Sequence, residues 1–413
     1  MVDLEAIRRA AERIGPVIRP TPLIQSHGLT RRLGQPVWFK PENLQRGGSF
    51  KVRGAYNRMG DLSAAEKGAG VVCASAGNHA QGVALAATWN RIPSTIVMPI
   101  DTPLIKVERT KGYGGEVILH GTSIEETFEK AAEIVRQRGI TFIHPFDDLA
   151  VIAGQGTIGL ELLSDCPDLR TVLVPIGGGG LISGIGTALK ALNPNIRVIG
   201  VQAAGANSAV LSLRGKKLVS VKNPRTIADG IRVKKMSDMT FGIVQQVVDE
   251  VIDVSEEEIA KAIVYLLERG KLVVEGAGAV TTAALLSTRV AAGDGPICAI
   301  LSGGNIDTNL VARIIQRGLT TADRFLIVRI PIPDIPGRLS GILQALAGMR
   351  VNIVEIHHHR AGWEIPLGWT EVEIILETRD REHGDEIVEQ LTGIGFEVSR
   401  GPRGGADRMK VDS

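Results

Sequence analysis

Four consecutive glycines constrain this chain more than any other feature of its sequence. They follow residues 172–176, an apolar run with the pattern of a buried strand, and they lead into a helical pattern that runs through Ala188. Backbone amides without side chains can wrap an anion closely, and a helix N-terminus adds positive potential. We therefore expect a phosphate-binding loop at Gly177, Gly178, Gly179 and Gly180.

The common nucleotide-binding motifs do not fit this loop. A Rossmann fingerprint needs glycines at positions i, i+2 and i+5, but the third position is Ser183 counted from Gly178 and Ile182 counted from Gly177. The next predicted strand ends in Gln202, where an acidic ligand for a ribose would be expected. The sequence also contains no GxxxxGK[ST] motif, so dinucleotide and P-loop binding are both disfavoured.

Two further polar loops follow predicted strands. The apolar residues 71–74 precede the sequence SAGNHAQG, and residues 299–301 precede the sequence SGGN. In parallel α/β sheets, ligands bind at the carboxyl ends of the strands. A simple helix cap would need one short polar residue, whereas the first loop crowds four into a single turn: Ser75, Asn78, His79 and Gln81.

A single lysine, Lys51, lies among glycines in the sequence ENLQRGGSFKVRGA, beside a predicted turn. An amine held in a desolvated pocket loses part of its affinity for protons and becomes nucleophilic toward a carbonyl. Alone, such a residue would be interpreted as a surface lysine. The three loops described above favour a Schiff-base lysine instead.

Together these motifs resemble the fold type II pyridoxal-phosphate enzymes related to tryptophan synthase β, and most closely the threonine dehydratases (threonine ammonia-lyases). The resemblance covers roughly residues 3–318 and implies a two-lobed α/β catalytic domain that binds pyridoxal 5′-phosphate. It makes Lys51 the Schiff-base lysine, Asn78 the partner of the cofactor's ring hydroxyl, and places Ser302 opposite the pyridine nitrogen. The phosphate would be held by Gly177, Gly178, Gly179, Gly180 and Leu181. The substrate carboxylate would be received by Ser75, Gly77, Asn78 and His79.

The resemblance also implies a reaction. A serine opposite the pyridine nitrogen supplies no counter-charge, so the cofactor is a weaker electron sink and prompt loss of a β leaving group is favoured. Lys51 would remove the α proton, and the β-hydroxyl would depart with a proton from a nearby acid, which in related enzymes is the bound phosphate. L-Threonine would give 2-oxobutanoate and ammonia, and L-serine would give pyruvate.

Other functions remain open on the same scaffold. Serine racemases of this family carry a second serine in the substrate loop, where this chain has Ala76, so elimination is favoured over racemisation. A β-replacement synthase and a non-catalytic amino-acid sensor are two further candidates, although a sensor needs no Schiff-base lysine. The preference for threonine over serine rests on the resemblance alone.

Two acidic residues have no assigned role at this level. Glu275 is followed by Gly276, whereas relatives more usually have proline there. Asp229, in the sequence TIADG, falls near a cation site of some relatives but equally suits a structural turn. No metal is predicted.

Composition and charge narrow the class of protein. The 413 residues are 44% apolar and 22% charged, which describes a soluble globular chain of two domains or more. With a net charge of +2 and no long basic run, the chain would not attract nucleic acid electrostatically. No apolar run is long enough for a membrane helix. Three widely spaced cysteines, Cys73, Cys166 and Cys298, predict buried free thiols in a reducing compartment. With no signal-peptide pattern, we expect a cytoplasmic protein.

Strand-like and helix-like patterns alternate over residues 1–320. Such alternation predicts a mostly parallel sheet covered by helices on both faces. We assign residues 1–320 to the catalytic domain, with a smaller lobe at roughly 54–140 and the cofactor between the two lobes.

The pattern changes in residues 323–402, where it predicts the order β-α-β-β-α-β, with a first strand at 325–330 and a last at 396–399. This order, with DIPGRL followed by NI, resembles the ACT domain, a small α+β ferredoxin-like module that senses amino acids and usually pairs with another copy. It implies an amino-acid effector such as isoleucine or valine, a dimer or tetramer, and candidate effector residues Asp334, Gly337 and Asn352. The sequence does not tell which amino acid is the effector or whether it activates or inhibits. It also leaves open whether the protein serves isoleucine biosynthesis or threonine breakdown.

Two other features complete the C-terminal part. Three successive histidines, His357, His358 and His359, could suggest a metal site, but neighbours on a strand point to opposite faces and cannot converge on one ion. Residues 403–413 are predicted to form a polar tail.

Overall fold

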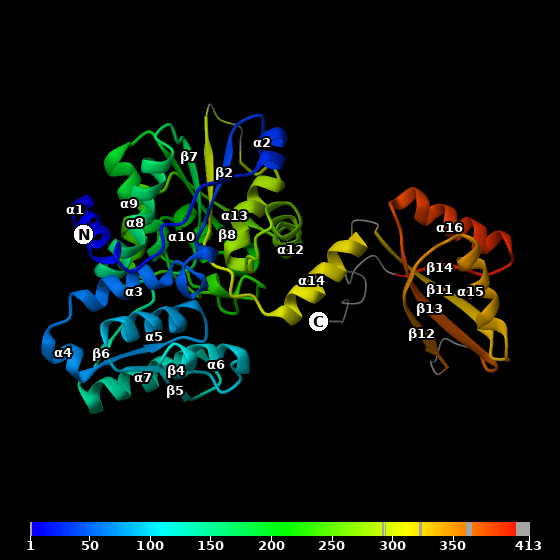
Figure 1. Cartoon of the computed structure of the whole chain (residues 1–413), viewed down its shortest axis with the longest axis horizontal. Coiled ribbons are helices and arrows are strands. Elements are labelled where there is room, and N and C mark those ends of the chain that lie inside the picture. The colour runs from blue at the N-terminus through cyan, green and yellow to red at the C-terminus, as the bar shows by residue number, and fades with distance from the viewer. Residues whose placement is uncertain (1, 291–292, 294, 322–323, 361–365, 402–413) are drawn as a thin grey trace. The chain divides into compact units, whose positions relative to one another are not determined.

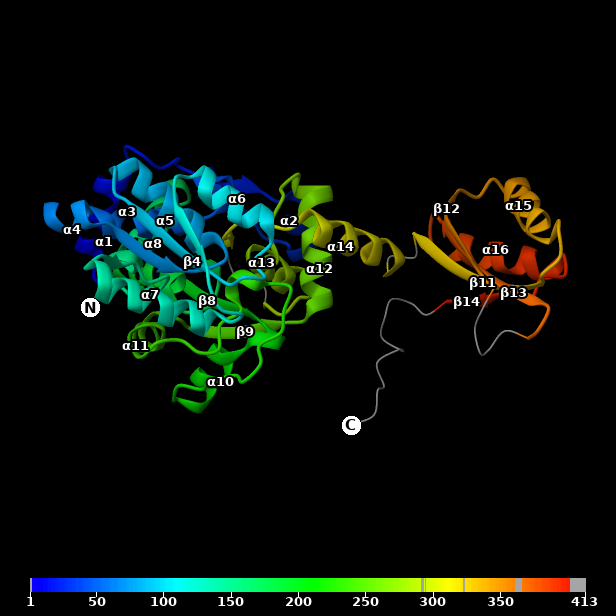
Figure 2. The ribbon, with the colours of Figure 1, turned by 90° about the horizontal axis from the view of Figure 1, so that it is seen from below.

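The computed structural model describes residues 2–290, 293, 295–321, 324–360 and 366–401. Contacts divide the chain into two compact units, Met1–Ile306 and Asp307–Ser413. Helix α14 (Thr308–Thr321), which the sequence analysis assigned to the catalytic domain, is grouped with the second unit. The tail predicted at 403–413 lies outside the described residues. Figures 1 and 2 show the chain from two directions.

The larger sheet of the first unit has six strands in the order β1-β2-β10-β7-β8-β9, in which only β1 and β2 pair antiparallel. Every residue of β7 and β10 is buried, as expected of parallel strands that helices cover on both faces. Figure 1 shows α8 and α9 on one side of this sheet and α13 on the other. The strands are β1 (Ile24–Gln25), β2 (Val37–Pro41), β7 (Thr171–Pro175), β8 (Arg197–Ala203), β9 (Glu250–Val254) and β10 (Ile297–Leu301). The helices are α1 (Leu4–Ile14), α2 (His27–Leu33), α8 (Leu149–Asp165), α9 (Gly180–Leu192), α10 (Ser208–Gly215), α11 (Asp238–Val247), α12 (Glu256–Tyr265) and α13 (Gly276–Leu286).

The smaller sheet is fully parallel, in the order β5-β4-β3-β6. Successive residues of β3 (Val71–Ala74) point to opposite faces: Val71 and Cys73 pack with α3 and α5, and Val72 and Ala74 pack with α7. The other strands are β4 (Ser94–Met98), β5 (Glu116–Leu119) and β6 (Thr141–Phe142). The helices around them are α3 (Lys51–Gly60), α4 (Ala64–Ala69), α5 (Asn78–Asn90), α6 (Leu104–Gly112) and α7 (Ile124–Arg138).

Helix α8 packs closely against α3 and α9 through glycines. A Cβ added at Gly154 would lie 2.7 Å from the carbonyl oxygen of Arg53 and 2.7 Å from Cα of Gly54. A Cβ added at Gly184 of α9 would lie 2.3 Å from the carbonyl oxygen of Ile152. These backbones approach so closely that side chains cannot be inserted, and α3, which carries Lys51, is thereby seated against the larger sheet's helices.

The second unit contains the predicted β-α-β-β-α-β order. Its strands form an antiparallel sheet in the order β12-β13-β11-β14, and alternate residues of β13 are buried against α15 and α16. The elements are β11 (Phe325–Pro333), α15 (Arg338–Gly348), β12 (Ile353–His359), β13 (Trp369–Glu377), α16 (Arg381–Gly393) and β14 (Ser399–Arg400).

Two details of this unit bear on the sequence analysis. The last strand was predicted at 396–399 and is wrong in extent: Phe396 and Val398 pack against the core, and only Ser399 and Arg400 pair with β11. The histidines lie on the exposed edge strand β12, where the rings of His357 and His359 stack at 6.1 Å between centroids. Those two therefore share one face.

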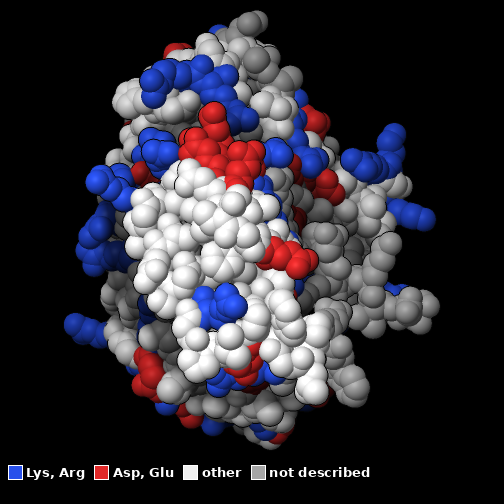
Figure 3. All heavy atoms as spheres, turned by 90° about the vertical axis from the view of Figure 1, so that its right-hand side faces the viewer, with Lys and Arg blue, Asp and Glu red and all other residues white. Residues whose placement is uncertain are grey.

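Three expectations from the sequence concern surface charge, membrane-spanning helices and the cysteines. Figure 3 shows both basic and acidic side chains on the face that it displays. Among the described residues, no helix combines the length and the apolar composition that crossing a membrane requires. The three cysteines are buried and free.

The close contact between α8 and α3 makes a testable prediction. Gly154→Ala would force backbone against backbone and should lower the free energy of unfolding by about 1–3 kcal/mol. Gly68→Ala in the exposed helix α4 is the matched control, because its Cβ would meet nothing within 4 Å. This substitution should not lower the free energy of unfolding and should raise it by at most about 1 kcal/mol. Urea unfolding measures both. Equal midpoints for Gly154→Ala and the original chain would contradict the packing argument.

Candidate functional site

A cavity of about 1320 Å³ lies in the first unit, where the loops after β3, β7 and β10 meet the start of α3. It brings together every residue that the sequence assigned to cofactor and substrate. Those lining residues are Lys51, Ser75, Gly77, Asn78, His79, Gly177, Gly178, Gly179, Gly180, Leu181 and Ser302. The convergence follows from topology, because parallel strands in each sheet direct their carboxyl ends to one edge.

Lys51 is the first residue of helix α3 and directly follows the turn residue Phe50. Its Nζ donates a hydrogen bond of 2.9 Å to the carbonyl oxygen of Pro145 and lies 5.1 Å from the centre of the Phe50 ring. Burial lowers the pKa of Lys51 to about 8, and the nearby carboxylate of Glu275 partly opposes that shift. The amine is therefore far more often neutral near pH 7 than an ordinary lysine, as a nucleophile toward an aldehyde must be.

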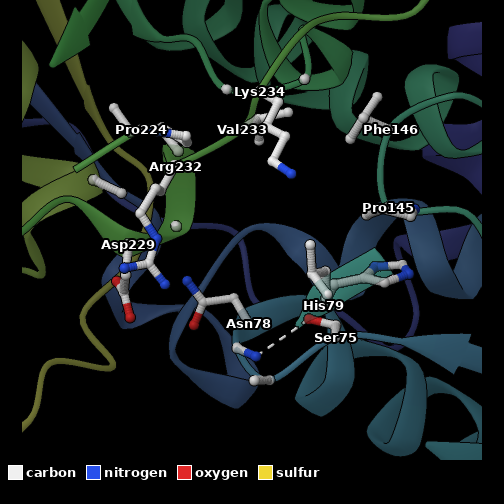
Figure 4. Close-up of a pocket in the computed structure, with 18 of the residues that line it drawn as sticks. Ser75, Asn78, His79, Pro145, Phe146, Pro224, Asp229, Arg232, Val233 and Lys234 are labelled. Carbon is white, nitrogen blue, oxygen red and sulfur yellow. Dashed lines mark hydrogen bonds between the residues drawn. The ribbon is translucent and has the colours of Figure 1, made fainter. Parts of the chain in front are cut away.

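The polar loop after β3 faces this amine. Ser75 Oγ accepts a hydrogen bond of 3.2 Å from the backbone N–H of Gly77, which Figure 4 marks with a dashed line. Helix α5 begins at Asn78 with no side-chain cap from Gly77. The first N–H groups of a helix lack intrahelical partners, so this terminus can receive a carboxylate.

His79 is held as a neutral imidazole. Its Nε2 lies 2.8 Å from the carbonyl oxygen of Ile143, and because a carbonyl only accepts, Nε2 carries the proton. Burial, reinforced by the positive charge of Lys51, lowers the pKa of His79 to about 3. Its Nδ1 is buried without a hydrogen-bond partner among the described residues. A lone pair cannot donate to a carboxylate, so His79 can serve one only through its backbone N–H.

The glycine loop has the form of an anion cradle. Gly179 has a φ of 92°, a left-handed conformation that favours glycine, and it caps α9 without a side-chain hydrogen bond. A Cβ at Gly178 would lie 2.2 Å from the Phe146 ring, and one at Gly180 would lie 2.9 Å from Phe146 Cβ. The free amides at the start of α9, with no room for side chains, fit a bound phosphate.

Sequence reasoning left Glu275 without a role, and the structure places it at the cavity. Burial, together with Asp229, raises the pKa of Glu275 above the usual carboxyl value. Its Oε1 accepts a hydrogen bond of 2.6 Å from Asn78 Nδ2. Asn305, which the sequence analysis did not single out, donates from Nδ2 to Asn78 Oδ1 at 2.9 Å.

The structure also explains the glycine after Glu275. A Cβ at Gly276 would lie 2.6 Å from the carbonyl oxygen of Ile227 and 2.9 Å from Cα of Ala228. Proline has a Cβ, so it would push away the segment that carries Asp229. Glycine at 276 permits this close approach.

Two ion pairs join the smaller sheet's helices to the other side of the cavity. Lys106 of α6 lies 2.7 Å from Asp229, and Glu125 of α7 lies 2.5 Å from Lys234. Figure 4 shows Lys234 across the cavity from Ser75 and His79, and Asp229 and Arg232 beside Asn78. Asp229 is thus engaged by an ammonium group. Among the described residues, no three His, Cys, Asp or Glu side chains are placed to hold a metal ion.

The three candidate effector residues of the second unit do not meet within one chain. The backbone N–H of Asp334 donates to Gly368 before β13, and the carbonyl oxygen of Asn352 accepts from Glu377 at the end of β13. Nine residues of extended strand separate these two ends by roughly 26 Å. Gly337 lies with Asp334, just before α15, and Asn352 lies at the opposite end of the sheet.

Comparisons with known proteins support a pyridoxal-phosphate site in this cavity. The family model described as pyridoxal-phosphate dependent enzyme matches residues 14–303. The chain belongs to this family. It is 48% identical over 398 residues to the L-threonine ammonia-lyase of Geobacter sulfurreducens and 46% identical over 398 residues to that of Thermotoga maritima, each covering 96% of this chain and 99% of the relative.

Solved structures are similar over about three quarters of the chain. The T.th. threonine deaminase superposes with a TM-score of 0.70 at 40% identity, covering 74% of this chain and 99% of that one. Maize serine racemase gives a TM-score of 0.73 at 38% identity, covering 77% and 98%. The predicted fold type II α/β architecture with an added C-terminal antiparallel sheet, and the predicted pyridoxal phosphate cofactor, are confirmed.

The lowered pKa of Lys51 predicts the pH dependence of cofactor attachment. Only the neutral amine attacks an aldehyde, so the rate of covalent pyridoxal-phosphate uptake by the cofactor-free protein should rise with pH and level off above about 8. Stopped-flow absorbance measures this rate, with Lys51→Ala as the control that gives no covalent signal. A rate still rising toward about 10.4, the ordinary lysine value, would contradict the assignment.

Proposed function

We propose that this protein converts L-threonine to 2-oxobutanoate and ammonia, and L-serine to pyruvate and ammonia, with pyridoxal phosphate as cofactor. The observation that carries the proposal is the single cavity in which the Lys51 amine, the uncapped start of α5 and the glycine cradle converge. The L-threonine ammonia-lyases aligned over 96% of the chain support the same substrate class.

Each part of the cavity has a role in this proposal. Residues 177–181 and the start of α9 would hold the phosphate, Asn78 would donate to the ring hydroxyl oxygen, and Ser302 would face the ring nitrogen. When bound, the cofactor supplies an electron sink for the α carbon. The substrate carboxylate binds the loop of Ser75, Gly77, Asn78 and His79, through backbone N–H groups where His79 is concerned.

Lys51 would have two roles. Its neutral amine would hold the cofactor through a bond to the aldehyde carbon, with loss of water, and as a free amine its Nζ would take the α proton of the substrate. A pKa of about 8 suits this base, since the group can both lose and regain a proton near neutral pH. The carbonyl oxygen of Pro145 accepts a hydrogen bond from Nζ and so fixes the position of the amine.

Racemisation of serine is the second candidate, favoured by the 38% identity to maize serine racemase. Against it, the cavity wall at the corresponding loop position is the methyl group of Ala76. A methyl group cannot exchange a proton, so this position offers no acid or base for the opposite face of the substrate. A β-replacement synthase and a non-catalytic sensor have no further observation in their favour.

The deciding experiment is 2-oxo acid release by the pyridoxal-phosphate-loaded protein. L-Threonine should give 2-oxobutanoate and L-serine pyruvate, and Lys51→Ala should abolish both together with the covalent cofactor absorbance. Lys130→Ala, in helix α7 but outside the cavity lining, is the matched control and should keep full activity. Chiral analysis of the remaining serine tests racemisation. Cofactor binding without oxo acid from either substrate would reject the proposal.

For the second unit, we propose an ACT-like regulatory domain at residues 323–402, in addition to a catalytic domain at 1–320. The β-α-β-β-α-β order and the antiparallel sheet support it. Because Asp334 and Asn352 lie at opposite ends of β13, one small effector can touch both only if a second copy supplies one of them. A dimer or tetramer is therefore part of the proposal. The buried free cysteines suit the cytoplasm, where we place the protein.

Regulation is tested on the full chain. Isoleucine or valine should change the rate of 2-oxobutanoate formation, and Asp334→Ala or Asn352→Ala should each reduce that response at least several-fold while leaving the rate without effector unchanged. Gln344→Ala, an exposed position of α15, serves as the control. An effector response that persists in both variants would show that the effector binds elsewhere.

A further inference from the structure

The amide of Asn78 can take only one orientation. The backbone oxygen of Gly47 can only accept, so the Asn305 atom 2.8 Å from it must be the donor Nδ2. That same Nδ2 lies 2.9 Å from Asn78, whose facing atom must therefore be the acceptor Oδ1. Asn78 Nδ2 is left pointing at Glu275 Oε1, at 2.6 Å. A backbone carbonyl thus fixes the whole chain of hydrogen bonds.

Two glycines leave space for the hydrogen bonds that link Asn305, Asn78 and Glu275. A Cβ at Gly303 would lie 2.6 Å from Glu275 Oε1 and 3.0 Å from Asn78 Nδ2. A Cβ at Gly230 would lie 3.3 Å from the same carboxylate oxygen. A side chain at either position would disrupt the hydrogen bond between Asn78 and Glu275. The two glycines belong to segments that are distant in the sequence.

The orientation leaves one hydrogen of Asn78 Nδ2 without a partner in the described part of the chain. The amide nitrogen has two hydrogens, and Glu275 takes one of them. Asn78 lines the cavity, so the second is available to a ligand there. A flipped amide would present an acceptor instead, and would place two oxygens together at Glu275.

We propose that Glu275, together with Asn305, is a positioning residue that makes Asn78 a hydrogen-bond donor to the ring oxygen of the cofactor and so favours the deprotonated form of that oxygen. The inference rests on the proposed role of Asn78. It holds for either protonation state of Glu275, because Oε1 accepts in both.

The test compares three variants in the pyridoxal-phosphate-loaded protein. Glu275→Leu removes the acceptor and should shift the two absorbance bands of the bound cofactor toward the form with a protonated ring oxygen. It should also weaken cofactor binding about threefold to tenfold, the effect of one lost hydrogen bond. Glu275→Gln keeps an acceptor oxygen and should retain the original bands. Asn305→Asp, which loses the donor to Asn78, should shift them as Glu275→Leu does.

The outcomes separate this inference from the proposed function. Original bands and affinity in both Glu275→Leu and Asn305→Asp would overturn the inference, as would a shift in Glu275→Gln equal to that in Glu275→Leu. If Glu275→Leu does not fold, Asn305→Asp decides alone. Absence of the cofactor bands in the original protein would instead reject the proposed function. A residue that served only the fold would change thermal stability and leave the band ratio untouched.

Discussion

The buried guanidinium of Arg53 holds the site in place. It donates from Nε and Nη2 to the two oxygens of Glu42, each at 2.8 Å, and from Nη1 to Glu161 at 2.5 Å. The Arg53 and Glu42 side chains are fully buried. Leaving such a charge unpaired would cost several kcal/mol, so the first turn of α3 has one allowed position. Lys51 lies two residues earlier, on the opposite side of that turn, and its amine is directed to the cavity by the same constraint.

This network joins segments that are distant in the chain. Glu42 follows β2, and Glu161 belongs to α8 and also bonds the buried Lys40 at 2.7 Å. The same α8 meets α3 backbone to backbone at Gly54. Ion pairing and glycine packing therefore act together on one helix. Lys51, which the polar loops surround, is therefore held in position by these contacts of α3.

The sequence allowed the loops of the site to be predicted because each carries its own local signal. A buried strand followed by glycines or short polar residues, in an alternating α/β chain, ends at the ligand edge of a parallel sheet. Asn78 and Ser302 were predicted in this way, and Lys51 was predicted from the glycines beside it together with these loops. The partners of Asn78 were not, because Glu275 and Asn305 are 197 and 227 residues away from it.

In the C-terminal unit, residues that are near in the sequence lie far apart in space. Asp334 and Asn352 are separated by one helix, yet that helix returns the chain to the start of the sheet, and β12 runs parallel to β11. They therefore mark opposite ends of a strand of roughly 26 Å, much longer than an amino acid. Strand β12 is also the sheet's edge and can pair with a second strand. If both residues contact the effector, its binding and the association of chains are one equilibrium, and an isolated chain would offer only half of the site.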